Sequence, residues 1–374
     1  MSLQKKHVIG IFVVAACAAL AALALLTPRG DGEWRPAARW RGFNLKGMCV
    51  WKPDGAPPKF SEADFALVKE WGFNFVRLPL DYRFWIKDGD WHNLDTDRLA
   101  PVDEAVEWGR KYGLHVQLCF HHAPGYCING TKGDRKLLFD DAKRPEDSRS
   151  TDALAAFTEH WRVFARRYRG IPNERLSFNL VNEPPGLDDA EVRRVFLPVI
   201  AAIRAEDAER FIVADGLCGG LDPVPPLEGL HNVGFATRGY RPLTFSHYGA
   251  NWFKDAYKRV PKWPYEVEEG PRKYSDDGRE YLYRVALSKW DATVEKGVFV
   301  MTGECGGMNT IPHAMFLAWM EDYLKLWKER GWGWALWELD SAFGVLDSGR
   351  KDVTYEEFRG HRLDRALLSL LQKY

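Results

Sequence analysis

Two glutamates stand at the ends of apolar segments that are typical of buried β-strands. Glu183 ends the segment Leu176–Glu183 and is followed at once by two prolines, and Glu304 ends the segment Val298–Glu304. An isolated carboxylate in an apolar setting is costly, so carboxylates at these positions indicate function. Two carboxylates that face each other across the mouth of a barrel form the pair that glycoside hydrolysis requires.

Further polar or aromatic side chains stand at the ends of other predicted strands, namely Arg77, His121, Asn182 and Trp337. Because side chains alternate along a strand, Arg77 is expected on the face of Phe75. The same alternation places Ser177, Asn179, Val181 and Glu183 on one face of their strand and Phe178 and Leu180 on the other.

Short apolar strands alternate with helical segments from Trp40 onward. The predicted strands are Arg41–Cys49, Phe73–Pro79, Leu114–His121, Leu176–Glu183, Arg210–Asp215, Val233–Tyr240, Val298–Glu304 and Gly333–Trp337. The predicted helices include Ser61–Trp71 with Ser61 as cap, Leu99–Tyr112, Asp152–Tyr168, Ala190–Ala208 and His313–Arg330. This alternation predicts the α/β class and a single (β/α)₈ TIM barrel over residues 33–374, whose chemistry lies at the carboxyl ends of the strands.

Residues 1–32 form a separate segment. Lys5 and Lys6 precede an apolar run from Val8 to Leu26 that reaches membrane-spanning length, and no clean small-x-small cleavage site follows it. An uncleaved membrane anchor is therefore favoured over a cleaved signal peptide. Val14–Cys17 also resembles a lipoprotein box, although apolar residues continue past Cys17. All three alternatives export the rest of the chain.

The composition argues against several classes of partner. The 52 basic and 52 acidic residues balance, which disfavours nucleic acid and other polyanions. Five cysteines follow Cys17 without zinc-like spacing; Cys119 and Cys127 could form a disulfide, but free buried thiols are favoured. His121 and His122 point to opposite faces of a strand, so both cannot easily bind one ion. We expect no metal, no cofactor and a monomeric catalytic domain.

An ordered set of motifs resembles glycoside hydrolase family 5, the cellulase-like group of the retaining clan. The set comprises Arg41-Gly42-Phe43-Asn44-Leu45, Phe75-Val76-Arg77-Leu78-Pro79, His121-His122-Ala123-Pro124-Gly125-Tyr126, Asn182-Glu183-Pro184, Gly303-Glu304, Trp334-Ala335-Leu336-Trp337 and Phe343-Gly344-Val345-Leu346-Asp347-Ser348. Asn-Glu-Pro alone is a weak signal, whereas the ordered set from about residue 40 to the C-terminus is strong.

The resemblance implies a role for each matching residue. Glu183 would be the general acid/base, with a pKa raised by burial and by its neighbour's charge, and Glu304 would be the nucleophile. Asn182 would bind the sugar 2-hydroxyl, and Arg77 would lie near Glu304 and keep it ionised. His121 matches the family histidine, Tyr240 matches the tyrosine that bonds the nucleophile, and Trp337 would floor the central sugar subsite.

One position departs from the family pattern. Many members carry His-x-Tyr-x-Pro at the sixth strand, where this chain has Arg238-Gly239-Tyr240-Arg241-Pro242. Arginine stays charged and does not shuttle protons. Arg238 is therefore expected to act as a fixed cation that lowers the pKa of Glu183 or grips a substrate oxygen. The alternative is a shifted register in which His247 takes the histidine's place.

The sequence leaves the polymer open. β-1,4-Glucan is the first expectation and β-mannan the second, and Trp51, Trp85, Trp252 and Trp263 are candidate platforms for sugar rings. A non-catalytic carbohydrate-binding barrel is the alternative from another class, but the presence of both glutamates speaks against it. A metal-dependent hydrolase lacks a clear His/Asp ligand set.

Overall fold

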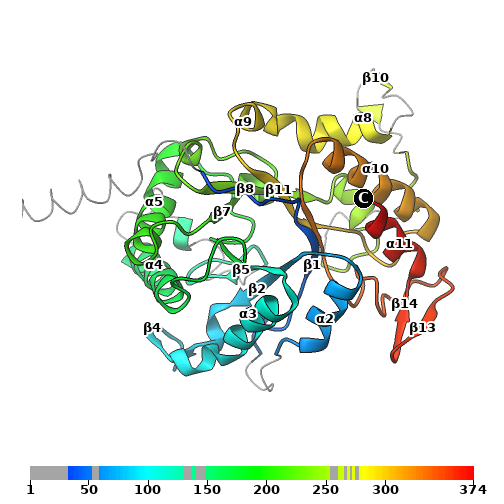
Figure 1. Ribbon diagram of the computed structural model, residues 1–374. Coiled ribbons are helices and arrows are strands. Elements are labelled where there is room, and N and C mark those ends of the chain that lie inside the picture. Colours follow the sequence, from blue (N-terminus) through cyan, green and yellow to red (C-terminus); the bar gives the residue numbers. More distant parts are fainter. Residues whose placement is uncertain are drawn as a thin grey trace, which may run out of the picture.

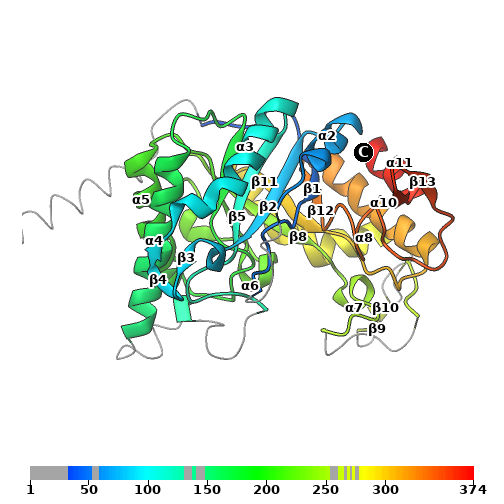
Figure 2. The same cartoon turned by 90° about the horizontal axis from the view of Figure 1, so that it is seen from below.

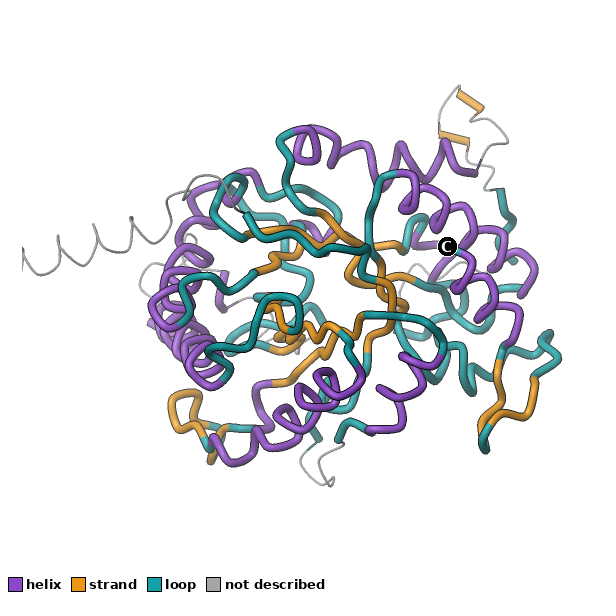
Figure 3. Tube along the Cα trace, in the orientation of Figure 1, coloured by secondary structure: helices purple, strands orange, loops and turns teal. Residues whose placement is uncertain are grey.

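Eight parallel strands close into a barrel in the order β1-β12-β11-β8-β7-β6-β5-β2. The computed structural model describes residues 33–52, 59–129, 137–139, 148–252, 260–264, 268–269, 272–273 and 278–374. The barrel strands are β1 (Arg41–Asn44), β2 (Phe75–Asp81), β5 (His115–His122), β6 (Leu176–Asn179), β7 (Ile212–Asp215), β8 (Val233–Gly239), β11 (Val300–Cys305) and β12 (Trp334–Leu336). They lie at the centre of the molecule with helices around them (Figures 1 and 3). The predicted (β/α)₈ barrel is confirmed.

The helices pack on the outside of the barrel through one apolar face. In α5 (Asp189–Glu206) the buried residues Val192, Val195, Phe196 and Val199 recur at helical spacing. The other long helices are α2 (Glu62–Glu70), α3 (Ala100–Tyr112), α4 (Ser148–Arg167), α10 (His313–Glu329) and α11 (Arg365–Lys373). Short helices include α6 (Leu217–Gly220), α7 (Leu243–Ser246), α8 (Gly278–Leu282) and α9 (Asp291–Glu295), and α6 and α7 lie on the lower side in Figure 2.

Local signals account for several helix ends. The Asp188 side chain accepts a hydrogen bond from the main-chain N–H of Glu191 at 2.9 Å and so caps α5. Gly113 ends α3 in the left-handed conformation, with φ of 67°, which favours glycine. Ser61 occupies the predicted cap position of α2, but its side chain makes no capping hydrogen bond.

The inside of the barrel has an apolar floor that is separate from the larger core outside the strands. Trp40, Phe75, Phe211, Val213, Ala236, Met301 and Ala335 form this floor. The ring of His115 stacks against Trp40, with ring centroids 4.0 Å apart. Because residues i and i+2 of a strand share a face, Arg77, Asp215 and Arg238 lie one layer above Phe75, Val213 and Ala236. The floor therefore supports a polar layer.

Two strands end well before the C-terminal bounds that the sequence predicts. β1 ends at Asn44, after which the chain leaves the barrel wall and meets β2 again at a bridge between Met48 and Leu80. β6 ends at Asn179, four residues before Glu183. The apolar runs predict buried residues at both places. Residues there are indeed buried, but they lie beyond the regular pairing of the barrel strands.

The N-terminal prediction lies outside the described residues, because residues 1–32 are not among them. Within the part of the chain that the structure describes, no helix has the length and apolar character needed to cross a membrane. The five cysteines after Cys17 are all free thiols, and only Cys218 is exposed.

The floor predicts a test of stability. Phe75 is fully buried and packs against Trp40 and His115, so Phe75→Ala should lower the free energy of unfolding by about 3–5 kcal/mol. Val50→Ala, at a side chain that is 50% exposed, should change it by less than about 0.5 kcal/mol. Denaturant unfolding of both variants measures the difference. A loss below about 1 kcal/mol for Phe75→Ala would contradict the role of the floor.

Candidate active site

Glu304 reaches the barrel interior because β11 is irregular. Met301 belongs to the apolar floor, so simple alternation would turn Gly303 inward rather than Glu304. The register of β11 against β8 shifts between Thr302 and Glu304, which is the signature of a β-bulge. The bulge turns the Glu304 carboxylate inward, where Arg77 donates to its Oε1 at 2.6 Å and the Tyr240 hydroxyl donates to its Oε2 at 3.1 Å.

Glu183 reaches the same place by a different route. Its φ of 49° lies in the left-handed region that non-glycine residues rarely adopt. Its main-chain N–H donates to Asp215 Oδ2 at 2.9 Å, and its carbonyl accepts from the Tyr126 hydroxyl at 2.5 Å. These two contacts hold the unusual backbone from both sides.

The predicted alternation through Glu183 is wrong at one residue. Val181 packs in the outer core together with Phe178 and Leu180, rather than on the inner face with Asn179. Strand geometry has ended at Asn179, so Asn182 and Glu183, although adjacent, both turn toward the interior.

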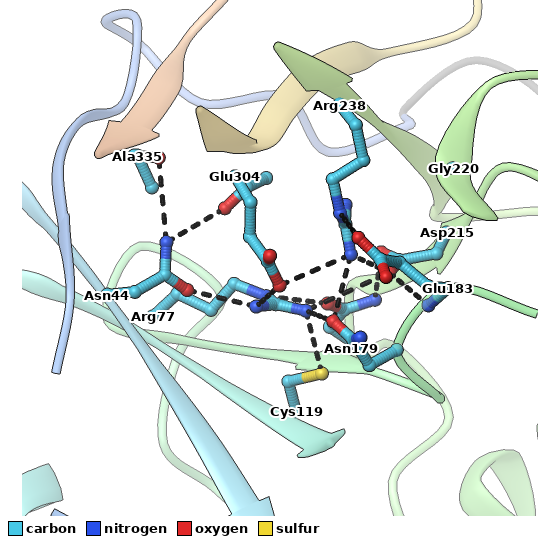
Figure 4. Close-up of polar contacts among 12 residues, drawn as sticks. Asn44, Arg77, Cys119, Asn179, Glu183, Asp215, Gly220, Arg238, Glu304 and Ala335 are labelled. Atoms are coloured by element: carbon cyan, nitrogen blue, oxygen red, sulfur yellow. Dashed lines mark hydrogen bonds and ion pairs between the residues drawn. The ribbon is translucent and has the colours of Figure 1, made fainter. Parts of the chain in front are cut away.

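Arg238 lies between the two glutamates (Figure 4). Its side chain is 1% exposed, its Nε donates to Glu183 Oε1 at 2.9 Å, and its Nη2 lies 3.4 Å from Glu304 Oε1. The same Nη2 also contacts Asp215. One guanidinium therefore contacts both carboxyl groups. Arg238 faces the site, so the alternative of a shifted strand register is not needed.

His247 lies beside this cluster rather than in it. Its Nδ1 is 2.8 Å from the Ser246 hydroxyl, and its ring packs edge-on against Tyr240, with centroids 5.4 Å apart. Burial lowers the pKa of His247 to about 4. Through its ring contact, His247 lies next to Tyr240, the residue that hydrogen-bonds Glu304.

Asn182 bridges the two arginines. Its Oδ1 accepts from Arg77 Nη2 at 2.8 Å and from Arg238 Nη2 at 2.9 Å. With the oxygen occupied in this way, the side-chain Nδ2 points elsewhere, and it is buried without a partner among the residues that the structure describes. A buried donor that lacks a partner marks a place where a ligand can supply one.

The pKa of Glu183 is raised from its ordinary value to about 7. Burial is the largest cause and the negative charge of Glu304 is the second, while Arg238 acts in the opposite direction. Arg238 therefore lowers this pKa as predicted, but its effect is outweighed. At neutral pH the Glu183 carboxyl holds a proton for a substantial part of the time.

His121 and Trp337 form a stacked pair at the rim of this cluster. Their ring centroids are 5.4 Å apart and the planes are inclined by 18°. Burial lowers the pKa of His121 well below its ordinary value, which favours a neutral ring, and its Nδ1 has no partner among the described residues. Lys46 Nζ lies 5.4 Å from the centre of the Trp337 ring and pairs with the buried Glu338.

The other candidate tryptophans differ in their surroundings. Trp85 is fully buried and donates to His160 Nδ1 at 3.2 Å, so its prediction as a sugar platform is wrong: the ring fills the core. Trp263 donates to Asp322 at 2.9 Å and packs against Phe245, which is also a structural role. Trp51 lies under the Arg83 guanidinium, which covers one face of its ring, whereas Trp252 is 59% exposed and remains a candidate platform.

Several residues of the site have no role in the sequence prediction. Asn44 accepts from Arg77 Nη1 at 2.9 Å, Asn179 accepts from Arg77 Nε at 2.9 Å, and Cys119 Sγ lies 3.0 Å from Arg77 Nη2. Asp215 accepts from Asn179 at 2.9 Å and pairs with Arg238. Asn44, Asn179 and Asp215 each end a barrel strand, and that position is the signal that could have identified them.

No group of three or more His, Cys, Asp or Glu residues suited to a metal ion occurs within the described ranges. His122 turns away from His121, with its Nε2 3.4 Å from Cys127 Sγ and its Nδ1 3.7 Å from Asp81. Glu183 and Glu304, which meet at the barrel mouth, are side chains suited to acid, base and nucleophilic chemistry.

Comparison with known proteins places this arrangement in a family. The model of the cellulase family, glycosyl hydrolase family 5, matches residues 33–343. Endoglucanase C of Acetivibrio thermocellus is 27% identical over 342 residues, which cover 84% of this chain and 95% of that protein. Cellodextrinase A of Ruminococcus flavefaciens is 27% identical over 303 residues, which cover 78% of this chain and 82% of that protein.

Solved structures agree with this result. A structure described as a glycoside hydrolase is 35% identical, with a TM-score of 0.81 over 90% of this chain and 99% of its own. Cel5A of Thermotoga maritima, in complex with mannotriose, is 22% identical with a TM-score of 0.69 over 89% of this chain and 97% of its own, which is a likeness of fold. With the family model covering most of the barrel, this chain belongs to glycosyl hydrolase family 5 and is a glycosidase.

Proposed function

We propose that the chain is a retaining hydrolase of a β-linked polysaccharide, with β-1,4-glucan as its substrate. The observation that carries the proposal is the single Arg238 guanidinium between two carboxyl groups of different character. Glu183 has a pKa of about 7, while Glu304 accepts from Arg77 and Tyr240. Two carboxyl groups whose surroundings differ in this way take the roles of acid and nucleophile.

In the proposed reaction the two glutamates act by double displacement. Glu304 attacks the anomeric carbon, forming a bond through its carboxylate oxygen, while the glycosidic C–O bond breaks and Glu183 gives its proton to the leaving oxygen. Glu183, now ionised, takes a proton from water. The resulting hydroxyl attacks the anomeric carbon and releases Glu304. Arg77 balances the charge of Glu304, and Arg77 and Tyr240 together orient its carboxylate.

Substrate contacts are assigned to the remaining residues. The free Nδ2 of Asn182 is a donor for the sugar 2-hydroxyl, where hydrogen bonds strengthen in the transition state. The Trp337 ring, backed by His121, suits the apolar face of a sugar ring at the cleavage point. We place Arg77, His121, Arg238, Tyr240 and His247 around this subsite as positioning groups.

The choice of glucan rests on relatives. The two relatives compared above are named an endoglucanase and a cellodextrinase. β-Mannan is the second candidate, because Thermotoga maritima Cel5A was solved with mannotriose as well as with cellobiose. We further propose that residues 33–374 act as a monomeric catalytic domain and that residues 1–32 export it and anchor it in the membrane.

Removal of either glutamate should separate the two roles. Glu304→Gln should abolish release of reducing ends from every polymer, because no nucleophile remains. Glu183→Gln should slow polymer hydrolysis by about 10²–10⁴-fold. It should slow formation of the glycosyl-enzyme far less with an aryl glycoside, whose leaving group needs no proton.

The experiment combines a panel of β-glucans and β-mannans with NMR analysis of the anomer released. Polymer hydrolysis that survives Glu304→Gln, or an inverted product, would refute the mechanism. Binding of glycans without release of reducing ends by the wild-type protein would favour a carbohydrate-binding barrel.

The pKa of Glu183 predicts the alkaline limb of the pH profile. The acid must be protonated for the first step, so kcat/KM should fall as pH rises through about 7. The same raised pKa means that the folded state keeps a proton that the unfolded state has lost between about pH 4.5 and 7. The contribution of Glu183 to stability should therefore decrease as pH rises through this window.

Thermal unfolding from pH 4 to 8 measures this linkage against Glu183→Gln, in which it is absent. A stability difference between wild type and Glu183→Gln that does not change with pH would show that Glu183 titrates normally.

Arg238→Lys tests whether the site needs the rigid, planar guanidinium rather than a positive charge alone. A lysine carries the charge but cannot bond Glu183, Asn182 and Asp215 from one rigid plane. We expect kcat/KM to fall by about 10–100-fold, since charge-assisted hydrogen bonds contribute about 1.5–3 kcal/mol. Turnover and pH profile equal to wild type would remove Arg238 from the mechanism.

A further inference from the structure

Asp215 is a fully buried carboxylate of the cluster, and the proposed reaction does not use it. Its side chain is 0% exposed at the end of β7. Oδ1 accepts from Asn179 at 2.9 Å, and Oδ2 accepts from the main-chain N–H of Glu183 at 2.9 Å and pairs with Arg238. Arg77 Nη2 is more distant, at 3.8 Å. The role of this buried carboxylate therefore lies in the groups that it binds.

Glycines leave room for the arm of Arg238 to reach Asp215. A Cβ at Gly220 would lie 2.6 Å from Arg238 Cγ, and a Cβ at Gly303 would lie 3.0 Å from Arg238 Nη1. Gly220 is also left-handed, with φ of 84°, and its carbonyl accepts from the Thr237 hydroxyl at 2.9 Å. The Arg238 side chain is therefore confined along its length, and Asp215 fixes the guanidinium at its end (Figure 4).

We propose that Asp215 is a positioning residue of the reaction. Its carboxylate holds the Arg238 guanidinium between Glu183 and Glu304, and it holds the left-handed main chain of Glu183 through the same oxygen. The inference rests on the proposed function, in which Glu183 is the acid/base. Asp215 touches neither substrate nor reacting atoms and acts through these two neighbours.

The electrostatic role of Asp215 has a definite sign. Its negative charge raises the pKa of Glu183, and its partner Arg238 lowers it. Without the carboxylate, Glu183 loses a repelling charge and also faces a less balanced cation, and both changes favour its ionised form. The groups that face Glu183 are Glu304 from β11, Arg238 from β8 and Asp215 from β7, together with Tyr240, Tyr126 and Cys127 from the loops. Arg77 from β2 pairs with Asp215 and Glu304 in the same cluster.

The two members of the pair should therefore shift the titration of Glu183 in opposite directions. Asp215→Asn should lower the pKa of Glu183, and Arg238→Met should raise it, each by about one unit or more. The double variant should lie between them. Loss of structure alone would impair both single variants without producing opposite shifts.

The titration is measured on the full chain by ¹³C NMR of carboxyl-labelled glutamate, with the Glu183 signal assigned by its absence in Glu183→Gln. This readout does not depend on catalysis. The alkaline limb of kcat/KM on the glucan polymer is measured in parallel and should move with the titration. Asp222→Asn is the matched control, because Asp222 pairs with Lys289 outside the cluster and should leave both readouts unchanged.

An unchanged Glu183 titration in folded Asp215→Asn would overturn the inference, whatever the activity. The predicted shifts together with no hydrolysis of any polymer would instead refute the proposed function. If Asp215→Asn does not fold, Arg238→Met is compared with the double variant, which leaves neither buried charge of the pair without its partner. The pKa of Glu183 should be lower in the double variant, and equal values would contradict the role of Asp215.

Discussion

Charge balance inside the barrel is the constraint on which the site depends. Burying an ion without a partner costs several kcal/mol, even after the protein relaxes. Arg77 and Arg238 share one buried layer with the carboxyl groups of Asp215, Glu304 and Glu183. Two cations balance two carboxylates, so this layer is neutral when Glu183 holds a proton. The protonated acid that the reaction needs is thus the state that the buried cluster itself favours.

Departures from regular strand geometry complete the cluster. The bulge in β11 turns Glu304 inward, and the left-handed backbone of Glu183 lets two adjacent residues face the same site. Regular alternation would direct every second side chain to the outer core. The hydrogen bonds from Glu183 to Asp215 and from Tyr126 to Glu183 stabilise a conformation that is strained on its own.

The sequence predicts the barrel and the inward-facing residues of its regular strands. Arg77 follows Phe75 by two residues and needs only alternation to be placed, and the motif order identifies Glu183, Glu304 and Tyr240. Asp215 was not predicted as part of the site, because a single acidic residue at a strand end does not reveal that it meets an arginine from the next strand. Trp85 was misplaced because an aromatic ring in a sequence looks the same whether it faces a cleft or the core. The prediction that Val181 faces inward was wrong, because no sequence pattern marks where a strand ends inside an apolar run.

The apolar floor beneath the cluster has a consequence for proton traffic. Trp40, Phe75, Phe211 and Met301 close the barrel from below with apolar side chains. His115, which stacks among these rings, has a pKa lowered to about 3 by burial and stays neutral near pH 7. The Glu183 side chain, on the other side of the charged layer, is 18% exposed and can exchange its proton with solvent directly. In the proposed reaction a bound glycan covers this exposed part of Glu183, so the proton that Glu183 donates is the one it held before binding. Glu183 recovers a proton from the water that attacks in the second step.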